Sequence, residues 1–164
     1  MRVKNLSILL CYVENVDGGK MLFKVAISRL AMGKIISHTK KPYEQIGLLL
    51  GGLEGGELKV TDAIEGEGEA DGSTSIFSAR RMAKIAQEMM MGKIQGSIVG
   101  WYHSHVGCGV FMSDMDVQTQ LKLQQFSPYI IAIVIDSVLD EFGVFTYLNN
   151  VGIVQLPEEY ITIE

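Results

Sequence analysis

The chain has 164 residues, of which 48% are hydrophobic and 20% are charged. This length fits one domain, and the composition excludes a disordered chain, a collagen-like chain and a disulfide scaffold. The formal net charge of −5 argues against a protein that binds nucleic acid through its phosphates. The two cysteines, Cys11 and Cys108, are too few for a disulfide framework and fit a reducing cytoplasm.

We expect neither a membrane span nor a secretion signal. The longest apolar runs, at 48–50 and 130–135, are far shorter than the ~20 residues that cross a bilayer. The apolar stretch at 6–13 leads into acidic residues rather than into a small-residue cleavage site. The sequence therefore predicts a single cytoplasmic domain over residues 1–164.

The first part of the chain is expected to hold two strands and a helix. Strands are predicted at 6–13, before a turn at 17–19, and at 23–27. The helix that follows ends before Pro42, which cannot continue it. Its apolar residues lie near helical spacing: Ile27, Leu30, Ala31 and Ile35.

The middle of the chain is expected to hold two more strands, a loop and a second helix. The apolar run at 46–52 predicts a strand buried on both faces, and 58–64 predicts a shorter strand after a glycine turn. Residues 65–74 are acidic and rich in glycine, so we expect a mobile surface loop. The next helix ends at Gly92, and its apolar residues recur at helical spacing: Met82, Ile85, Ala86 and Met89.

The last part of the chain continues the same alternation. We expect a strand at 97–103, a helix at about 113–125, and two strands at 130–136 and 142–147. Alternating strands and helices predict an α/β or α+β fold, in which helices flank a mixed β-sheet.

Two histidines stand at the end of the strand predicted at 97–103. His103 and His105 are two residues apart, so strand alternation places both imidazoles on one face and Ser104 on the other. Neighbouring imidazoles suit a divalent metal such as zinc. The spacing alone is also compatible with two exposed histidines at a strand end.

Ser113 and Asp116 introduce the helix that follows these histidines. The spacing Ser-x-x-Asp before a helix is a capping pattern, and by itself it indicates a helix cap. In combination with His103 and His105, Asp116 would supply a third metal ligand. Three protein ligands leave the fourth position of zinc for water, which is the arrangement of a catalytic zinc.

Glu44 stands just before the apolar run at 46–52. On strand periodicity it shares a face with three apolar residues of that run: Ile46, Leu48 and Leu50. An unpaired carboxylate beside a buried strand is unfavourable, so Glu44 needs a partner or a function. The alternative is a carboxylate that remains in water, since nothing in the local sequence brings Glu44 to His103.

Together these residues resemble the JAMM, or MPN+, motif of a metalloprotease family. The motif His-x-His-x7-Ser-x2-Asp is matched in order by four residues: His103, His105, Ser113 and Asp116. The segment 43–51 resembles the glutamate-bearing strand of the family, in which Glu-x-x-Gly precedes three apolar residues and a second Gly. The resemblance covers about residues 22–150. The subgroup that it resembles most is the deubiquitinase of the proteasome lid with its archaeal homologues.

The resemblance implies a fold and a reaction. The fold would be a single MPN domain, a sandwich similar to cytidine deaminase. His103, His105 and Asp116 would bind one zinc ion per chain, Glu44 would take a proton from the zinc-bound water, and Ser113 would stabilise the oxyanion. The reaction would be hydrolysis of the isopeptide bond between the C-terminal Gly-Gly of ubiquitin, or of a ubiquitin-like modifier, and a substrate lysine.

The resemblance also implies partners and leaves alternatives. The partners would be conjugates of ubiquitin or a ubiquitin-like modifier, with the proteasome or another MPN-type protein in an assembly. The main alternative is an MPN scaffold that is inactive or autoinhibited alone, although all five motif positions are filled here.

Three other chemistries fit the sequence less well. A thiol nucleophile at Cys108 lacks a group that orients its base. A non-haem iron oxygenase would not require Glu44 or Ser113. A zinc deaminase would need His-x-Glu and Pro-Cys-x-x-Cys elements that the chain lacks.

We also expect the acidic loop at 65–74 to contact substrate. It carries four acidic residues and no basic one: Glu65, Glu67, Glu69 and Asp71. The corresponding insertion of the family lies beside the active site and can pair as a strand with the tail of the modifier. The acidic side chains would then favour a basic tail through electrostatic steering. The alternative is a solvated turn whose charge only aids solubility.

Overall fold

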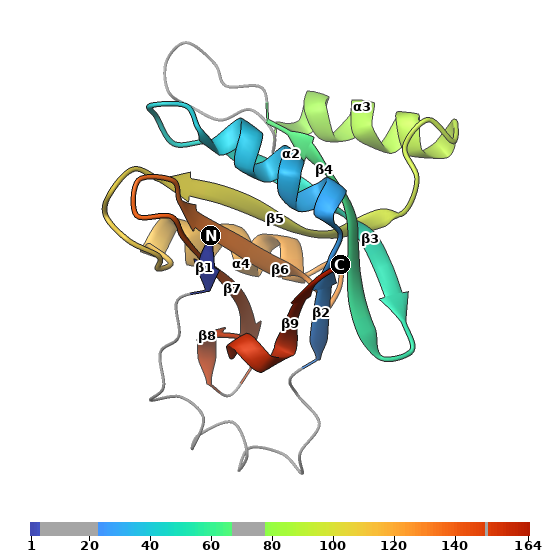
Figure 1. Cartoon of the computed structure of the whole chain (residues 1–164). Helices are drawn as coiled ribbons and strands as arrows, with labels where there is room; N and C mark the ends of the chain where they lie inside the picture. Colours follow the sequence, from blue (N-terminus) through green and yellow to red (C-terminus); the bar gives the residue numbers. More distant parts are fainter. Residues whose placement is uncertain (4–22, 67–77, 150) are drawn as a thin grey trace.

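The computed structural model describes residues 1–3, 23–66, 78–149 and 151–164, which form one sheet with helices on both faces (Figure 1). The helices are α2 (Arg29–Thr39), α3 (Ala79–Met90), α4 (Asp114–Gln124) and the 3-10 helix η2 (Glu158–Tyr160). The strands are β1 (Arg2–Val3), β2 (Lys24–Ile27), β3 (Ile46–Glu54), β4 (Glu57–Glu65), β5 (Ser97–His105), β6 (Ile131–Asp136), β7 (Glu141–Leu148), β8 (Gly152–Gln155) and β9 (Ile161–Ile163).

The sheet is mixed, as the sequence predicts. Its strand order is β1-β7-β6-β5-β3-β4-β2-β9, and β8 pairs with β7 beside this path. Strand β5 lies near the middle, antiparallel to β3 and parallel to β6. Because β5 pairs with a neighbour on each side, it lies inside the sheet rather than at an edge.

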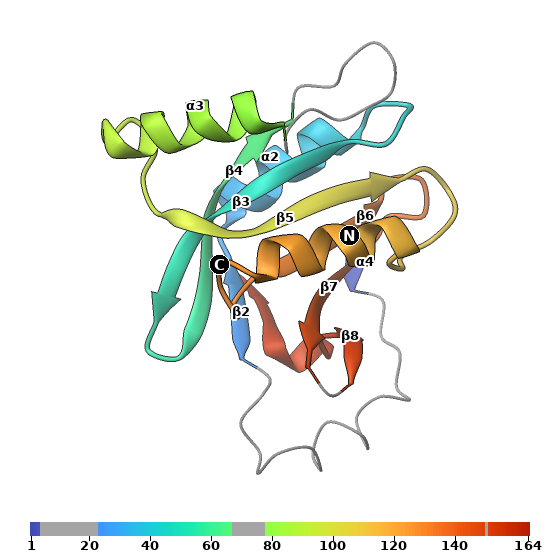
Figure 2. The same ribbon diagram turned by 180° about the vertical axis from the view of Figure 1, so that it is seen from behind.

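Each face of the sheet has its own apolar core. On one face, α2 packs through residues such as Ile35 on a cluster that includes Tyr102. On the other face, Ile85 of α3 and Leu123 of α4 pack on a cluster that includes Trp101. Figure 2 shows α4 crossing in front of the sheet from this second side. Trp101 and Tyr102 belong to different cores because successive strand residues point to opposite faces.

The first helix differs in detail from its prediction. Ser28 is the N-cap, with its side chain accepting a hydrogen bond from the N–H of Ala31, so α2 begins only at Arg29. Ile27 therefore ends strand β2, and Leu30 is 60% exposed rather than part of the apolar face. The buried residues of α2 are Ala31, Met32, Ile35, His38 and Thr39.

The later elements mostly agree with the sequence. Helix α3 ends before Gly92, as predicted, and Gly92 has a φ of 69°. Of the four apolar residues expected on its inner face, only Ile85 is fully buried, and Ala86 is exposed. The strand predicted at 97–103 continues to His105, because β5 keeps pairing with β6 as far as Asp136. Both histidines thus lie within the sheet rather than one of them in a loop.

Some expectations lie outside the described residues, and some strands were not predicted. The strand at 6–13, the turn at 17–19 and residues 67–74 of the acidic loop lie outside, while Glu65 ends strand β4. The sequence did not predict β1, β8 or β9, which have only two to four residues each. Strand β9 forms because it pairs in parallel with the distant β2, a contact that no local pattern shows.

Candidate metal centre

The two predicted histidines lie side by side at the end of β5. His103 and His105 are 6% and 4% exposed, and their ring centroids are 5.0 Å apart. Ser104 points to the opposite face, where its hydroxyl accepts a hydrogen bond from the backbone N–H of Gln45 at 2.8 Å. Strand alternation therefore places the two imidazoles on one face, as the sequence predicts. Both are buried, so the alternative of two exposed histidines at a strand end is wrong.

His105 is oriented by a hydrogen bond. Its Nδ1 lies 2.7 Å from the carbonyl oxygen of Gly109, which can only accept, so Nδ1 donates and, in the neutral ring, Nε2 carries the lone pair. The loop that presents this carbonyl is held by Asp136 at the end of β6. The N–H groups of Gly107 and Gly109 donate to the Asp136 carboxylate at 3.0 and 2.7 Å. A hydrogen bond of this kind, from the other ring nitrogen to a backbone carbonyl, commonly orients a histidine that binds a metal.

Asp136 is fully buried and was not recognised as important from the sequence. The N–H groups of Val138 and Leu139 also donate to it, both at 3.0 Å. Burial raises the pKa of Asp136, but the four backbone N–H groups outweigh this effect and leave the pKa below its usual value. Asp136 therefore stays ionised and fixes the loop beside His105.

His103 has no such hydrogen bond. Both of its ring nitrogens are buried, and neither has a hydrogen-bond partner among the described residues. Its Nε2 lies 3.3 Å from Oδ2 of Asp116. Buried polar atoms are nearly always paired, so an imidazole left in this state indicates a ligand that completes it.

Asp116 comes from the first turn of α4, where it also caps the helix. The N–H and hydroxyl of Ser113 donate to Oδ2 of Asp116 at 2.7 and 2.6 Å, and the Ser113 hydroxyl accepts from the Asp116 N–H. This is the capping box that the spacing predicts. Burial raises the pKa of Asp116, but the nearby His103 and the Ser113 hydrogen bonds outweigh it and hold the pKa at about 2.

The three side chains fit a zinc ion. One ligand atom from each of His103, His105 and Asp116 lies within 4.8 Å of the other two. Tetrahedral bonds of about 2 Å would separate ligand atoms by about 3.3 Å. The separation between His103 Nε2 and Asp116 Oδ2 already equals this value. Two imidazoles and one carboxylate are a donor set that zinc accepts.

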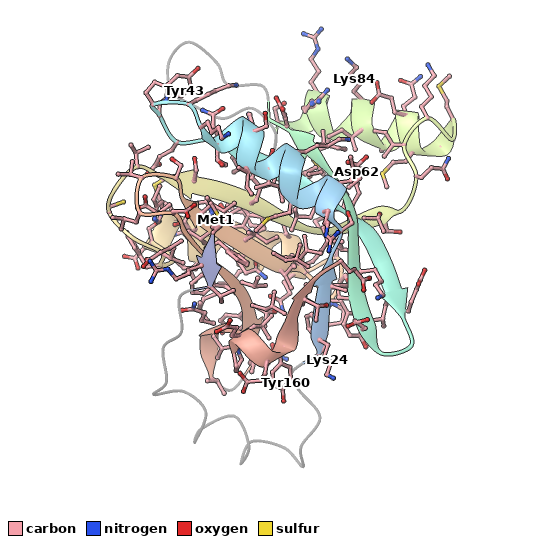
Figure 3. The ribbon with its side chains drawn as sticks, in the orientation of Figure 1. Met1, Lys24, Tyr43, Asp62, Lys84 and Tyr160 are labelled. Carbon is pink, nitrogen blue, oxygen red and sulfur yellow. The ribbon has the colours of Figure 1, made fainter. Side chains whose placement is uncertain are left out.

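Glu44 lies in water at the edge of the same cavity. The cavity has a volume of about 370 Å³ and is lined by residues that include Glu44, His103, Ser113 and Asp116. Glu44 precedes β3 rather than sharing its buried face, and it is exposed. It follows the exposed Tyr43, which Figure 3 labels on the loop between α2 and β3.

Sheet register explains how Glu44 reaches residues 59 positions away in the sequence. Ile46 is the partner of His103 in the antiparallel pair of β3 and β5. The pairing continues beyond the strand, where the N–H of Ser104 donates to the carbonyl of Gln45 at 2.9 Å. Glu44, the next residue back, is therefore carried to the end of β5 that bears the histidines.

The structure does not support Cys108 as a nucleophile activated by His105. Cys108 is exposed and also lines the cavity. The Nδ1 atom of His105 is engaged with Gly109 rather than with the thiol. A cysteine nucleophile needs a neighbouring base, and among the described residues no hydrogen bond joins Cys108 to one.

Gln120 is a second residue that sequence reasoning missed. It is fully buried in α4, and its side-chain oxygen accepts a hydrogen bond from the indole N–H of Trp101 at 2.8 Å. Trp101 in turn stacks on His103. The only sign of this role in the sequence is that Gln120 follows Asp116 by one helical turn. The spacing points to Trp101 only once α4 is packed on the sheet.

Comparison with known proteins agrees with this geometry. The family model described as JAB1/Mov34/MPN/PAD-1 ubiquitin protease matches residues 21–129. COP9 signalosome complex subunit 5a of Arabidopsis thaliana is 34% identical over 119 residues, which are 69% of this chain and 33% of the relative. The 26S proteasome regulatory subunit rpn11 of Schizosaccharomyces pombe is 31% identical over 122 residues, 70% of this chain and 38% of the relative.

The chain therefore spans about a third of the length of the curated relatives that it matches. A further relative, COP9 signalosome complex subunit 5 of Drosophila melanogaster, is 34% identical over 70% of this chain and 36% of its own length. Among the described residues, no helix is long and apolar enough to cross a membrane.

Proposed function

The chain belongs to the JAB1/Mov34/MPN/PAD-1 family, and from this premise we propose that it is a zinc-dependent isopeptidase. Its substrates would carry ubiquitin or a ubiquitin-like modifier whose C-terminal Gly-Gly is joined to a lysine side chain. The observation that carries the proposal is the buried imidazole of His103, which has no hydrogen-bond partner among the described residues and lies 3.3 Å from Asp116, in the cavity that Glu44 also lines.

His103, His105 and Asp116 would hold the zinc. When bound there, zinc lowers the pKa of a coordinated water to near 7 and polarises the scissile carbonyl. Asp116 arrives ionised, since its pKa is held at about 2 by the balance of burial against His103 and Ser113. The hydrogen bond from Nδ1 of His105 to Gly109 leaves Nε2 as the ring nitrogen available to a metal. Asp116 thus presents the carboxylate that metal binding requires.

Glu44 would be the general base and then the general acid. It is exposed, and no ion pair among the described residues engages its carboxylate. A free carboxylate at the cavity edge can accept a proton from the attacking water and return it to the leaving lysine amine.

Ser113 would donate a hydrogen bond to the substrate carbonyl oxygen as negative charge develops there. In this structure its hydroxyl donates to Asp116. During the reaction the Ser113 hydroxyl would therefore turn from the Asp116 carboxylate to the substrate carbonyl.

The experiment compares Glu44→Gln with Glu54→Gln on a modifier–lysine conjugate. Glu54 is an exposed glutamate at the opposite end of β3 and serves as the matched control. We expect Glu44→Gln to keep about one zinc per chain and to lose on the order of 10²–10⁴-fold in turnover. Glu54→Gln should cleave as the unmodified chain does, and a chelator should stop cleavage.

Two results would contradict the proposal. Undiminished cleavage by Glu44→Gln would show that this carboxylate is not the base. A chain that binds zinc and the conjugate but never cleaves it, alone or in an assembly, would favour the scaffold instead.

A further inference from the structure

The two histidines of the candidate metal centre are supported in different ways. His105 donates through Nδ1 to Gly109, which fixes the rotation of its ring. His103 has no hydrogen bond at either ring nitrogen among the described residues. A metal ligand nearly always has a second-shell group that sets its orientation. For His103 that group must act without a hydrogen bond to the imidazole.

Trp101 is positioned to provide this support. It lies two residues before His103 on the same face of β5, and it is 1% exposed. The two ring centroids are 4.7 Å apart, and the ring planes differ by 17°, which is a stacked arrangement. A flat indole against one face of the imidazole restricts its rotation about the Cβ–Cγ bond, since turning the ring would drive its edge into the indole.

Gln120 holds the indole in its plane. The indole N–H donates to the side-chain oxygen of Gln120 at 2.8 Å. The Gln120 amide is itself fixed, because its NH₂ group donates to the carbonyl of Ile130 at 2.7 Å and to the side chain of Gln124 at 3.0 Å. A fully buried amide with three hydrogen bonds has little freedom to move.

One helix connects this support to the metal ligands. Asp116 lies in the first turn of α4, and Gln120 lies one turn later on the same side of the helix. Docking of α4 on the sheet thus places the carboxylate ligand and, through Trp101, sets the plane of His103. A shift of α4 would disturb two of the three ligands together.

We propose that Trp101 and Gln120 are positioning residues for the metal centre, which hold the His103 imidazole in the plane that zinc binding requires. This inference rests on the zinc site of the proposed function. It goes further in assigning the orientation of one ligand to a stacked tryptophan and its glutamine anchor.

The first experiment measures zinc affinity by competition with a chromogenic chelator. Gln120→Leu removes the anchor, and we expect it to weaken zinc binding by about 10-fold or more, as loss of an outer-shell partner does. Thr146→Val is the matched control. Thr146 is fully buried, and its hydroxyl donates to the same Ile130 carbonyl at 3.2 Å rather than to Trp101. Its zinc affinity should equal that of the unmodified chain.

The second experiment tests the stacking itself with a double-mutant cycle. Trp101→Phe keeps a flat ring but has no N–H for Gln120, whereas Trp101→Leu has no aromatic face. We expect zinc affinity to fall less in Trp101→Phe than in Trp101→Leu. Adding Gln120→Leu to Trp101→Phe should change the affinity little, because the link between the two side chains is already lost.

The fluorescence of Trp101 gives a third readout, because it is the only tryptophan of the chain. Co²⁺ bound beside His103 should quench its emission, and the visible Co²⁺ spectrum should change in Gln120→Leu but not in Thr146→Val. Circular dichroism of each variant in chelator checks that the metal-free chain is folded.

The outcomes separate this inference from the proposed function. Zinc affinity and Co²⁺ spectrum unchanged in Gln120→Leu and Trp101→Leu would overturn the positioning role alone. An equal loss of affinity in Thr146→Val would also overturn it, by showing a general effect of weakening the core. If the unmodified chain binds no zinc, the metal centre and this inference both fail.

Discussion

Replacing Asp136 by asparagine should destabilise the folded chain strongly, although the side chain keeps its shape. One oxygen of Asp136 accepts the N–H groups of Gly107, Val138 and Leu139, and the other accepts the N–H of Gly109 at 2.7 Å. Asparagine retains one oxygen but sets an NH₂ group in place of the other. Whichever way the amide turns, at least one buried N–H loses its acceptor.

The size of the effect follows from these contacts. A hydrogen bond to a charged group contributes about 1.5–3 kcal/mol, and leaving a buried donor unpaired costs about 1–3 kcal/mol. The two energies cannot simply be added, because both describe loss of the same acceptor. The hydrogen bonds that remain are also weakened, since asparagine carries no charge. We therefore expect Asp136→Asn to lower the free energy of unfolding by about 2–4 kcal/mol at neutral pH.

The pH dependence gives a second signature. Burial raises the pKa of Asp136, and its four N–H donors lower it by more, so the folded chain binds this proton less readily than the unfolded chain. The stability contributed by the carboxylate is present above the unfolded pKa of about 3.9 and is lost as pH falls through the folded pKa. The difference between the unmodified chain and Asp136→Asn should therefore narrow below about pH 4.

The assay is urea unfolding followed by circular dichroism, in chelator, at pH 7 and at several values below 4. Asp140→Asn is the control, since Asp140 is exposed and has a φ of 57° that asparagine also adopts readily. It should change stability by less than about 0.5 kcal/mol. A loss of under 0.5 kcal/mol in Asp136→Asn, or a difference that widens on acidification, would refute the reasoning.

Two further predictions concern Gly51 of β3 and the buried His38 of α2. A Cβ on Gly51 would clash with the carbonyl oxygen of Lys59, so Gly51→Ala should lower the free energy of unfolding in urea by at least the ~1–3 kcal/mol of an overpacked core. Gly52→Ala meets nothing within 4 Å and should be tolerated. Burial lowers the pKa of His38 more than the carboxylate of Glu65 raises it. On acidification the unfolded chain therefore protonates His38 before the folded chain does, and the free energy of unfolding in chelator should fall as pH drops below about 6.5. The fall should be less steep in His38→Asn. Equal pH slopes of stability in the two proteins would contradict this prediction.

Local patterns predicted the central elements because each of these carries its own signal. The apolar runs that became β3 and β6 are long enough to be recognised without their neighbours. The position of Leu30 was wrong because apolar spacing cannot show where a helix begins. That point depends on Ser28, whose hydroxyl takes a backbone N–H and leaves Ile27 to the preceding strand.

The positions of the candidate metal ligands were predictable for the same reason. The period of a strand placed His103 and His105 on one face, and the Ser-x-x-Asp spacing placed Asp116 at a helix start. Glu44 was different, since only the family resemblance connected it with the histidines. The register of β3 against β5 brings it to their end of the sheet, and register is a property of two strands rather than of either sequence.

The supporting residues could not have been found in this way. Gln120 and Asp136 are polar residues at ordinary places, one within a helix and one at the end of a strand. Their importance comes from burial together with the groups that they meet, the indole of Trp101 and the N–H groups of a loop. A buried polar group needs a hydrogen-bond partner only after the chain has folded and water has been excluded. The local sequence therefore does not show this need.

Asp116 shows why the helix cap and the metal ligand are not competing interpretations. A carboxylate has two oxygens and about four acceptor positions, and the cap occupies Oδ2 with the N–H and hydroxyl of Ser113. Acceptor capacity remains on the other oxygen, and Oδ2 itself gains a position for a metal when the Ser113 hydroxyl turns to substrate. The cap meanwhile fixes the rotamer of Asp116 and keeps it ionised, with a pKa of about 2 set by burial, His103 and Ser113. A ligand held by its own helix in this way loses little side-chain freedom when zinc binds, because the cap has already restricted it.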